Sequence, residues 1–276
     1  MSSNVALMRT AKAANHPNRG YIIPIGGAED RTENPVILRR FVELCGGSNA
    51  RIAIIPTASS LTDTGDLYKS VFSSLGVDPC RISILAFATR DDCRKRRYLK
   101  VLDRADGVFI TGGDQVRLVE MLSATQVAAK MLSRNANGMH IAGTSAGASA
   151  MSAQMIASGK TGITPRVGIV ELAAGLGLVD KVVIDQHFSQ RVRLGRLLMA
   201  VAALKTQAGI GLDENTAAII APNDTLEVVG SGTVTIIAPS NLRIGGAASA
   251  DDVVNVTGIH MHILVAGDMY DLRSIT

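Results

Sequence analysis

Short, uninterrupted apolar runs recur along this chain, and each of them ends in a cluster of polar residues and glycines. Apolar runs without alternation are typical of strands that are buried on both faces of a parallel sheet. The sequence therefore predicts buried strands at Tyr21–Ile25, Arg51–Ile55, Ile82–Phe87, Gly107–Ile110, Met139–Ala142, Val182–Ile184 and Ile210–Leu212.

Segments of helical character lie between several of these runs. We predict helices over Pro35–Cys45, Asp66–Leu75, Arg94–Asp103, Gln115–Arg134, Ala146–Ile156 and Gln190–Lys205. Alternating strands and helices predict an α/β fold with a mostly parallel sheet flanked by helices and right-handed crossovers. In such sheets functional groups gather where the strands end, which is where the polar clusters fall.

The pattern changes after Pro222. Thr225–Val229 and Thr233–Ile237 flank a Gly-Ser-Gly turn and predict a hairpin, and Val253–Ile259 and His262–Val265 predict further strands. We expect residues 1–20 to be a flexible lead-in and residues 21–276 to form a single α/β domain. Residues 222–276 would be its β-rich extension.

Composition excludes several classes of protein. The chain has 276 residues, of which 47% are hydrophobic and 19% charged, so it is not a disordered protein and can bury a large core. Its three cysteines are too few and too scattered for a disulfide framework or a zinc site. The first twenty residues contain no secretory signal, and the longest charge-free stretch, Asn135–Gly159, is too polar to cross a membrane. We therefore expect a cytoplasmic protein that does not bind a membrane.

The net charge of +4 comes from one local feature. The segment Arg90–Arg104 holds seven basic and three acidic residues, so the rest of the chain is neutral. It predicts a solvated helix face or a docking surface for a charged polymer. A nucleic-acid-binding protein is the non-enzymatic alternative, although aromatics at only 3% argue against binding by base stacking.

A possible nucleophile lies in the segment Gly143-Thr-Ser145-Ala-Gly147, which fits the G-x-S-x-G nucleophile elbow. The elbow is a sharp turn between a strand and a helix that exposes the serine hydroxyl. A predicted strand precedes Ser145 and a predicted helix of small residues follows it. The context therefore favours a catalytic serine over a simple glycine-rich turn.

A catalytic serine needs a general base. His187 is the candidate because it ends a buried run, whereas His140 lies inside a predicted strand and His16 in the lead-in. His260 and His262 lie on one face of a predicted strand, and no further His or Cys supports a metal site there, so we expect no metal.

The carboxylate that orients the base is open between three residues, Glu214, Asp213 and Asp185. Backbone amides near Gly113, in the glycine turn Thr111–Gln115, could form half of an oxyanion hole, and the amide of Ala146 the other half. The alternative for this turn is a phosphate-binding nest or a plain tight turn.

Three arginines follow His187 within nine residues. Guanidinium groups suit carboxylate recognition, so Arg191, Arg193 and Arg196 predict an anionic or zwitterionic substrate. The alternative is an exposed helix face.

Several of these segments together resemble the cyanophycinase family of dipeptidase E-like serine peptidases. The matching stretches lie in the family's order and spacing at Gly26–Arg31, Thr111–Gln115, Gly143–Ser149, Asp185–Leu197 and Gly209–Ala217. The resemblance implies a flavodoxin-like, class I glutamine-amidotransferase-like fold. It implies hydrolysis of cyanophycin, a polyaspartate that carries arginine on each side-chain carboxyl, to β-Asp-Arg dipeptides by a homodimer without a metal or organic cofactor.

The resemblance also implies roles for particular residues. Ser145 would be the nucleophile, His187 the base and Glu214 the orienting acid. The substrate pocket would be shaped by Gln115, Asp185, Gln186, Arg191, Arg193 and Arg196. Two other enzymes stay open: an aspartyl or isoaspartyl dipeptidase of the same fold, and an α/β-hydrolase esterase, whose Ser, acid, His order would make His260 or His262 the base.

Overall fold

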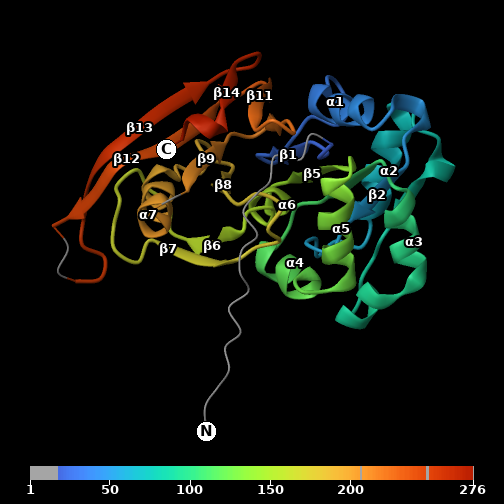
Figure 1. The fold of residues 1–276 in the computed structure, drawn as a ribbon, viewed down its shortest axis with the longest axis horizontal. Coiled ribbons are helices and arrows are strands. Elements are labelled where there is room, and N and C mark those ends of the chain that lie inside the picture. The colour runs from blue at the N-terminus through green and yellow to red at the C-terminus, as the bar shows by residue number, and fades with distance from the viewer. Residues whose placement is uncertain (1–17, 206, 247–248, 276) are drawn as a thin grey trace, which may run out of the picture.

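The computed structural model describes residues 18–205, 207–246 and 249–275. Most of the predicted lead-in, including His16, lies outside the described residues. Two sheets and a two-stranded ribbon organise the described part of the chain (Figure 1).

The larger sheet has eight strands, of which five are parallel to their neighbours and form one side of it. Three antiparallel strands extend the other side from β1. In spatial order, the strands are β14 (Met269–Asp271), β11 (Thr225–Gly230), β10 (Thr216–Ile220), β1 (Ile22–Ile25), β5 (His140–Thr144), β4 (Gly107–Ile110), β2 (Ile52–Ile55) and β3 (Ile82–Ile84). The predicted α/β class with a mostly parallel central sheet flanked by helices is confirmed.

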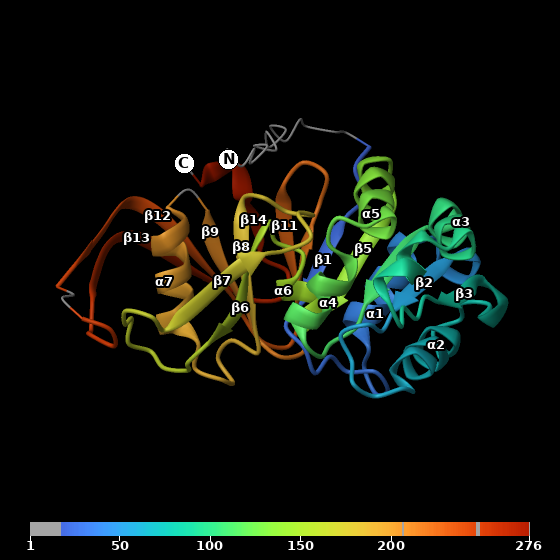
Figure 2. The same ribbon diagram turned by 90° about the horizontal axis from the view of Figure 1, so that it is seen from below.

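Helices cover both faces of the parallel strands (Figure 2). Side chains of a strand alternate between the two faces, so Ala53 packs in the core on one face and Ile54 in the core on the other. One face is covered by α1 (Val36–Leu44) and α2 (Thr64–Ser74). The opposite face is covered by α3 (Arg96–Arg104), α4 (Gln115–Leu122) and α5 (Gln126–Ala136).

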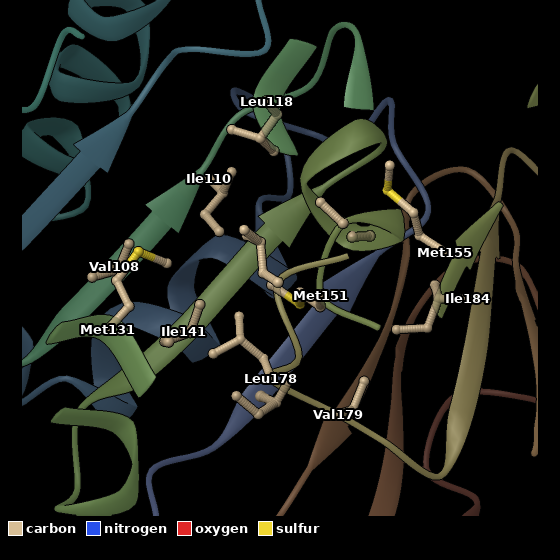
Figure 3. Close-up of a cluster of buried hydrophobic side chains, with 14 of the residues drawn as sticks. Val108, Ile110, Leu118, Met131, Ile141, Met151, Met155, Leu178, Val179 and Ile184 are labelled. Carbon is tan, nitrogen blue, oxygen red and sulfur yellow. The ribbon is translucent and has the colours of Figure 1, made fainter. Parts of the chain in front are cut away.

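The smaller sheet has four strands and packs against α7 (Leu194–Leu204). In spatial order they are β13 (Asn255–Leu264), β12 (Val234–Gly245), β9 (Ala208–Leu212) and β8 (Val182–Gln186). One buried cluster joins the two sheets: Ile141 of β5 and Ile184 of β8 belong to it, with Met151 and Met155 between them (Figure 3). The single-domain organisation of residues 21–276 stays a prediction.

Two predicted helices are shorter than the sequence indicated. The segment Gln115–Arg134 is two helices, because Ala124 adopts a left-handed conformation with φ of 56° and the Thr125 hydroxyl caps α5. The predicted helix Ala146–Ile156 ends after one turn, as α6 (Ala146–Ser149). Its second half is β6 (Gln154–Gly159), which pairs with β7 (Val170–Ala174). Cross-strand pairing overrides the helix-favouring composition there.

The prediction of a hairpin after Pro222 is wrong. The strands β11 and β12 are adjacent in sequence but enter different sheets, since β11 pairs with β10 and β14, and β12 with β9 and β13. The two predicted strands Val253–Ile259 and His262–Val265 are one continuous strand, β13. The helix predicted over Gln190–Lys205 begins only at Leu194. Among the described residues, none of the helices is long and apolar enough to cross a bilayer.

Candidate active site

Three polar side chains from three strand ends form a hydrogen-bonded line. Ser145 follows β5, His187 follows β8 and Glu214 follows β9. The Ser145 hydroxyl lies 2.9 Å from Nε2 of His187, and Nδ1 of His187 lies 2.6 Å from Oε1 of Glu214. Because β5 belongs to the larger sheet and β8 and β9 to the smaller one, the line lies where the two sheets meet.

Ser145 has the backbone geometry that a nucleophile elbow requires. Its φ of 53° and ψ of −112° are unusual for a residue other than glycine. The flanking glycines allow the turn, since a Cβ on Gly143 would lie 2.7 Å from the carbonyl oxygen of Gly147. A Cβ on Gly147 would lie 2.5 Å from the carbonyl oxygen of Ile110. The sequence motif therefore occurs in the strand–turn–helix context that was predicted for it.

His187 is held in a narrow space. Its own φ is 47°, and a Cβ on Gly27 would lie 2.4 Å from its Cε1 atom, so only glycine fits beneath the imidazole. Burial lowers the pKa of His187 below its usual value, and the charges of Arg191 and Arg193 add to this, while the hydrogen bond to Glu214 opposes it. The imidazole is therefore neutral near pH 7 and able to accept a proton.

The three candidate acids have different partners in the structure. Glu214 contacts the imidazole. Asp213 is buried and accepts hydrogen bonds from the amides of Ser189 and Thr233 and from the Thr233 hydroxyl. These bonds outweigh burial and lower the pKa of Asp213. Asp213 therefore braces the loops of Ser189 and Thr233, and Asp185, in β8, pairs with Arg193 and Arg196.

A glycine turn and the start of a short helix lie beside the Ser145 side chain. A Cβ on Gly112 would lie 3.3 Å from Cβ of Ser145, so the Gly112-Gly113 turn passes directly over the serine. Ala146 begins α6, where an amide has no partner one turn earlier in the helix. The oxyanion hole expected from the amides of Gly113 and Ala146 stays a prediction.

Two of the three arginines form ion pairs with the buried carboxylate of Asp185. Arg196 donates to both of its oxygens, and Nη1 of Arg193 lies 3.3 Å from Oδ1. Arg193 also donates to the backbone carbonyl of Gln186, and burial lowers the pKa of Arg193 to about 10. These arginines brace the segment that ends in His187, whereas Arg191 is exposed.

Two glutamines of the predicted pocket differ in position. The side-chain oxygen of Gln186 lies 3.4 Å from the Ser145 hydroxyl. The amide nitrogen of Gln115 donates to the carbonyl of Ala157 in β6 at 2.7 Å, so Gln115 ties α4 to the β6–β7 ribbon. His260 and His262 lie in β13, where the His262 ring packs against Tyr270, and His187 is instead the imidazole at Ser145. No group of metal-ligating side chains occurs among the described residues.

The end of β1 and the loop after it connect the segments that carry Ser145, His187 and Glu214. No individual role was predicted for this loop from the sequence. Three consecutive carbonyls, of the last residue of β1 and the first two residues of the loop, each accept an amide: Ile25 from Ser145 at 2.9 Å, Gly26 from His187 at 2.8 Å and Gly27 from Asn215 at 2.8 Å. The signal that pointed to this loop was its polar sequence Gly26–Arg31 directly after a buried strand.

Glu29 of the same loop is a buried carboxylate that the sequence reasoning also missed. Only 4% of its surface is exposed. The Tyr68 hydroxyl donates to its Oε1, and the Thr144 hydroxyl donates to its Oε2 at 2.5 Å. Because Thr144 directly precedes Ser145, Glu29 fixes the residue from which the elbow starts.

Comparison with known proteins gives a consistent result. The model of peptidase family S51 matches residues 22–229. A cyanophycinase of Trichormus variabilis is 40% identical over 98% of this chain and 90% of its own length. A cyanophycinase of Geminocystis herdmanii is 37% identical over 93% of this chain and 95% of its own length.

Solved structures support the fold. A peptidase from an acI-B1 Actinobacterium superposes with a TM-score of 0.65 at 20% identity, over 92% of this chain and 97% of that one. A putative peptidase E protein of Listeria monocytogenes EGD-e superposes with a TM-score of 0.51 at 18% identity, over 77% of this chain and 98% of that one.

A pair of matched variants tests the role of Glu29. Thr144→Val and Tyr68→Phe each remove one hydroxyl donor from Glu29, and each should lower the free energy of unfolding by about 1–3 kcal/mol. Only Thr144→Val should also slow the reaction of Ser145 with a sulfonyl fluoride, by about ten- to a hundredfold, because it loosens the elbow itself. Denaturant unfolding and inactivation kinetics measure the two effects. Equal inactivation rates in both variants would contradict a positioning role.

The pKa of His187 should govern the reactivity of Ser145. Inactivation by the sulfonyl fluoride should rise with pH to a plateau, with a midpoint below the usual imidazole value of about 6.5, because only neutral His187 accepts the proton. Arg191→Gln removes a nearby positive charge and should move this midpoint to higher pH. Arg94→Gln, an exposed arginine in another part of the chain, is the control and should leave it unchanged. A midpoint that Arg191→Gln moves to lower pH would refute this account.

Proposed function

The chain belongs to peptidase family S51, and we propose that it is a serine exopeptidase that hydrolyses cyanophycin to β-Asp-Arg dipeptides. The observation that carries this proposal is the hydrogen-bonded line of Ser145, His187 and Glu214 at the junction of the two sheets. Its relatives named cyanophycinase are 37–40% identical to it over at least 93% of its length, which indicates the substrate.

The proposed reaction begins with attack by the Ser145 hydroxyl on a main-chain aspartyl carbonyl. Nε2 of His187 accepts the hydroxyl proton, and Glu214 holds the ring in the required tautomer and stabilises the imidazolium. The carbonyl oxygen becomes an oxyanion that the amides of Gly113 and Ala146 stabilise.

The intermediate then collapses to an acyl-enzyme. His187 gives its proton to the leaving amine, and the bond between the carbonyl carbon and that amine breaks. A water molecule, deprotonated by His187, attacks the ester carbonyl and releases the second product with a free carboxylate. Ser145 regains its proton, so the cycle needs neither a metal nor an organic cofactor.

The substrate offers a carboxylate and a guanidinium on every repeat. We propose that exposed Arg191 binds the arginine α-carboxylate, because the other two arginines of the predicted pocket already pair with Asp185. Gln186, close to the Ser145 hydroxyl, would accept a hydrogen bond from the substrate. In this scheme Asp185, Arg193, Arg196 and Gln115 shape the pocket by fixing its walls.

We further propose a cytoplasmic location and assembly as a homodimer. All three cysteines are free thiols, and Cys80 is exposed, which suits a reducing compartment. Analytical ultracentrifugation of the purified protein measures the assembly state.

Replacement of the nucleophile tests the proposed activity. The purified protein should convert insoluble cyanophycin to a soluble product with the mass of β-Asp-Arg, and Ser145→Ala should lower the rate by about 10⁴-fold or more while the protein stays folded. Ser70→Ala, on the exposed side of α2, should leave the rate unchanged. Wild-type cleavage of short aspartyl dipeptides without cleavage of the polymer would identify an aspartyl dipeptidase instead.

Two adjacent carboxylates allow a controlled test of the orienting acid. Glu214→Gln should lower kcat by about 10²–10⁴-fold with little effect on stability, because it favours the wrong imidazole tautomer. Asp213→Asn should instead lower the free energy of unfolding by about 1–3 kcal/mol, because it mismatches a buried set of donors. Steady-state kinetics and denaturant unfolding of both variants separate these effects. A larger loss of kcat in Asp213→Asn than in Glu214→Gln would contradict this assignment and would indicate that Asp213 orients the imidazole.

A further inference from the structure

The basic segment Arg90–Arg104 plays no part in the proposed reaction. Three of its cations already have interaction partners close to them in the chain or in the fold. The guanidinium of Arg90 donates to two backbone carbonyls at the C-terminal end of α4. Lys95 pairs with Asp92, and the Arg97 guanidinium lies 4.7 Å from the centroid of the Tyr98 ring. Two others, Lys100 and Arg104, face a cleft.

This cleft has a volume of about 450 Å³ and lies between α3 and the start of two strands. Arg51 directly precedes β2, and Arg81 directly precedes β3. These strands run parallel to β5, and Ser145 follows the carboxyl end of β5. The cleft therefore lies at the amino ends of the strands, opposite the candidate active site. Figure 2 shows α3, β2 and β3 together at one end of the molecule. The lining consists of Arg51, Ile52, Asp78, Cys80, Arg81, Ser83, Lys100, Val101, Arg104 and Ala105.

Charge in this cleft is strongly unbalanced. Its four cationic side chains face a single carboxylate, that of Asp78, and Oδ1 of that carboxylate already accepts the amide of Cys80. Within the part of the chain that the structure describes, none of the four cations belongs to an ion pair. The acid on α3, Asp103, pairs with Lys130 instead.

We propose that this basic cleft binds a small polyanion that carries two or more linked phosphate groups. Guanidinium groups bind phosphate oxygens in pairs, and an ammonium adds a point charge, so three arginines and one lysine suit such an anion. Like charges gathered in a concave surface repel one another and concentrate a positive potential, which a polyanion relieves.

The charge pattern also discriminates between classes of partner. Cyanophycin carries a guanidinium beside every carboxylate, so the four cations would repel half of its charged groups. A nucleic acid needs an extended contact surface, whereas these cations surround one hollow, and the Arg97 guanidinium covers the neighbouring Tyr98 ring. A compact polyphosphate satisfies both constraints.

Charge-reversal variants with an internal control test this site. The probes are inorganic tripolyphosphate and ATP, added without divalent metal at low ionic strength and followed by isothermal titration calorimetry. Arg81→Glu with Lys100→Glu reverses two charges in the cleft, and Arg94→Glu with Arg96→Glu reverses two exposed charges of the same segment outside it. The cleft variant should weaken binding by about tenfold or more, and the control variant by about twofold or less.

The two probes separate the sources of the phosphate groups. Binding of both with similar affinity identifies the phosphate chain as the ligand, and a clear preference for ATP identifies a nucleotide. The double variant Arg51→Gln with Arg104→Gln neutralises the other two cations and should also weaken binding. It replaces the charge-reversal variant if that variant does not fold. Hydrolysis of cyanophycin by these variants should be unchanged, since none of these residues lies near Ser145.

Three results would overturn the proposal. The first is the lack of saturable binding of either probe by the wild-type protein. The second is an equal loss in the cleft and control variants, which would show a diffuse effect of surface charge. The third is tighter binding of a single- or double-stranded oligonucleotide than of tripolyphosphate, which would assign the segment to nucleic acid.

Discussion

The arrangement of Ser145, His187 and Glu214 depends on three backbone hydrogen bonds made at the end of β1 and the start of the loop after it. Consecutive carbonyls of Ile25, Gly26 and Gly27 accept the amides of Ser145, His187 and Asn215. These amides belong to chain segments that follow three different strands of two different sheets. A buried backbone carbonyl strongly favours having a partner, so each bond fixes one segment against the same short frame. The distances within the Ser145–His187–Glu214 line follow from this shared frame, and Glu29 reinforces it through Thr144.

A second constraint is the buried charge beneath the His187 segment. Asp185 is fully buried, and two arginines with little exposure satisfy its carboxylate. Burying such a group is expensive, but removal of one member would leave unpaired charge in the interior, which costs more. Arg193 also affects the site electrostatically, because its charge helps to lower the pKa of His187. Two of the three arginines after His187 thus form ion pairs inside the protein, beside the segment that ends in His187.

Charged residues gather at both ends of the parallel strands. At the carboxyl ends, Asp185 pairs with Arg193 and Arg196, Glu214 contacts His187, and the imidazole stays neutral. At the amino ends, the described lining of a cleft contains four cations and one carboxylate, that of Asp78. The segment Arg90–Arg104, which carries the net charge of +4, supplies two of these cations, Lys100 and Arg104. The separation allows a ligand at one edge of the sheet without competition from substrate at the other.

The sequence by itself determined the parallel half of the larger sheet, the elbow and the histidine that meets Ser145. Continuous apolar runs mark doubly buried strands, and a strand followed by Gly-x-Ser-x-Gly has few alternatives, because only glycine tolerates the close backbone contacts at Gly143 and Gly147. Tertiary structure alone decided which strands share a sheet, that β11 and β12 separate, and that Glu214 rather than Asp213 meets the imidazole. It also decided that two of three arginines are internal. These outcomes depend on contacts between residues far apart in the chain, and local periodicity carries no information about which distant partner a strand or a side chain will meet.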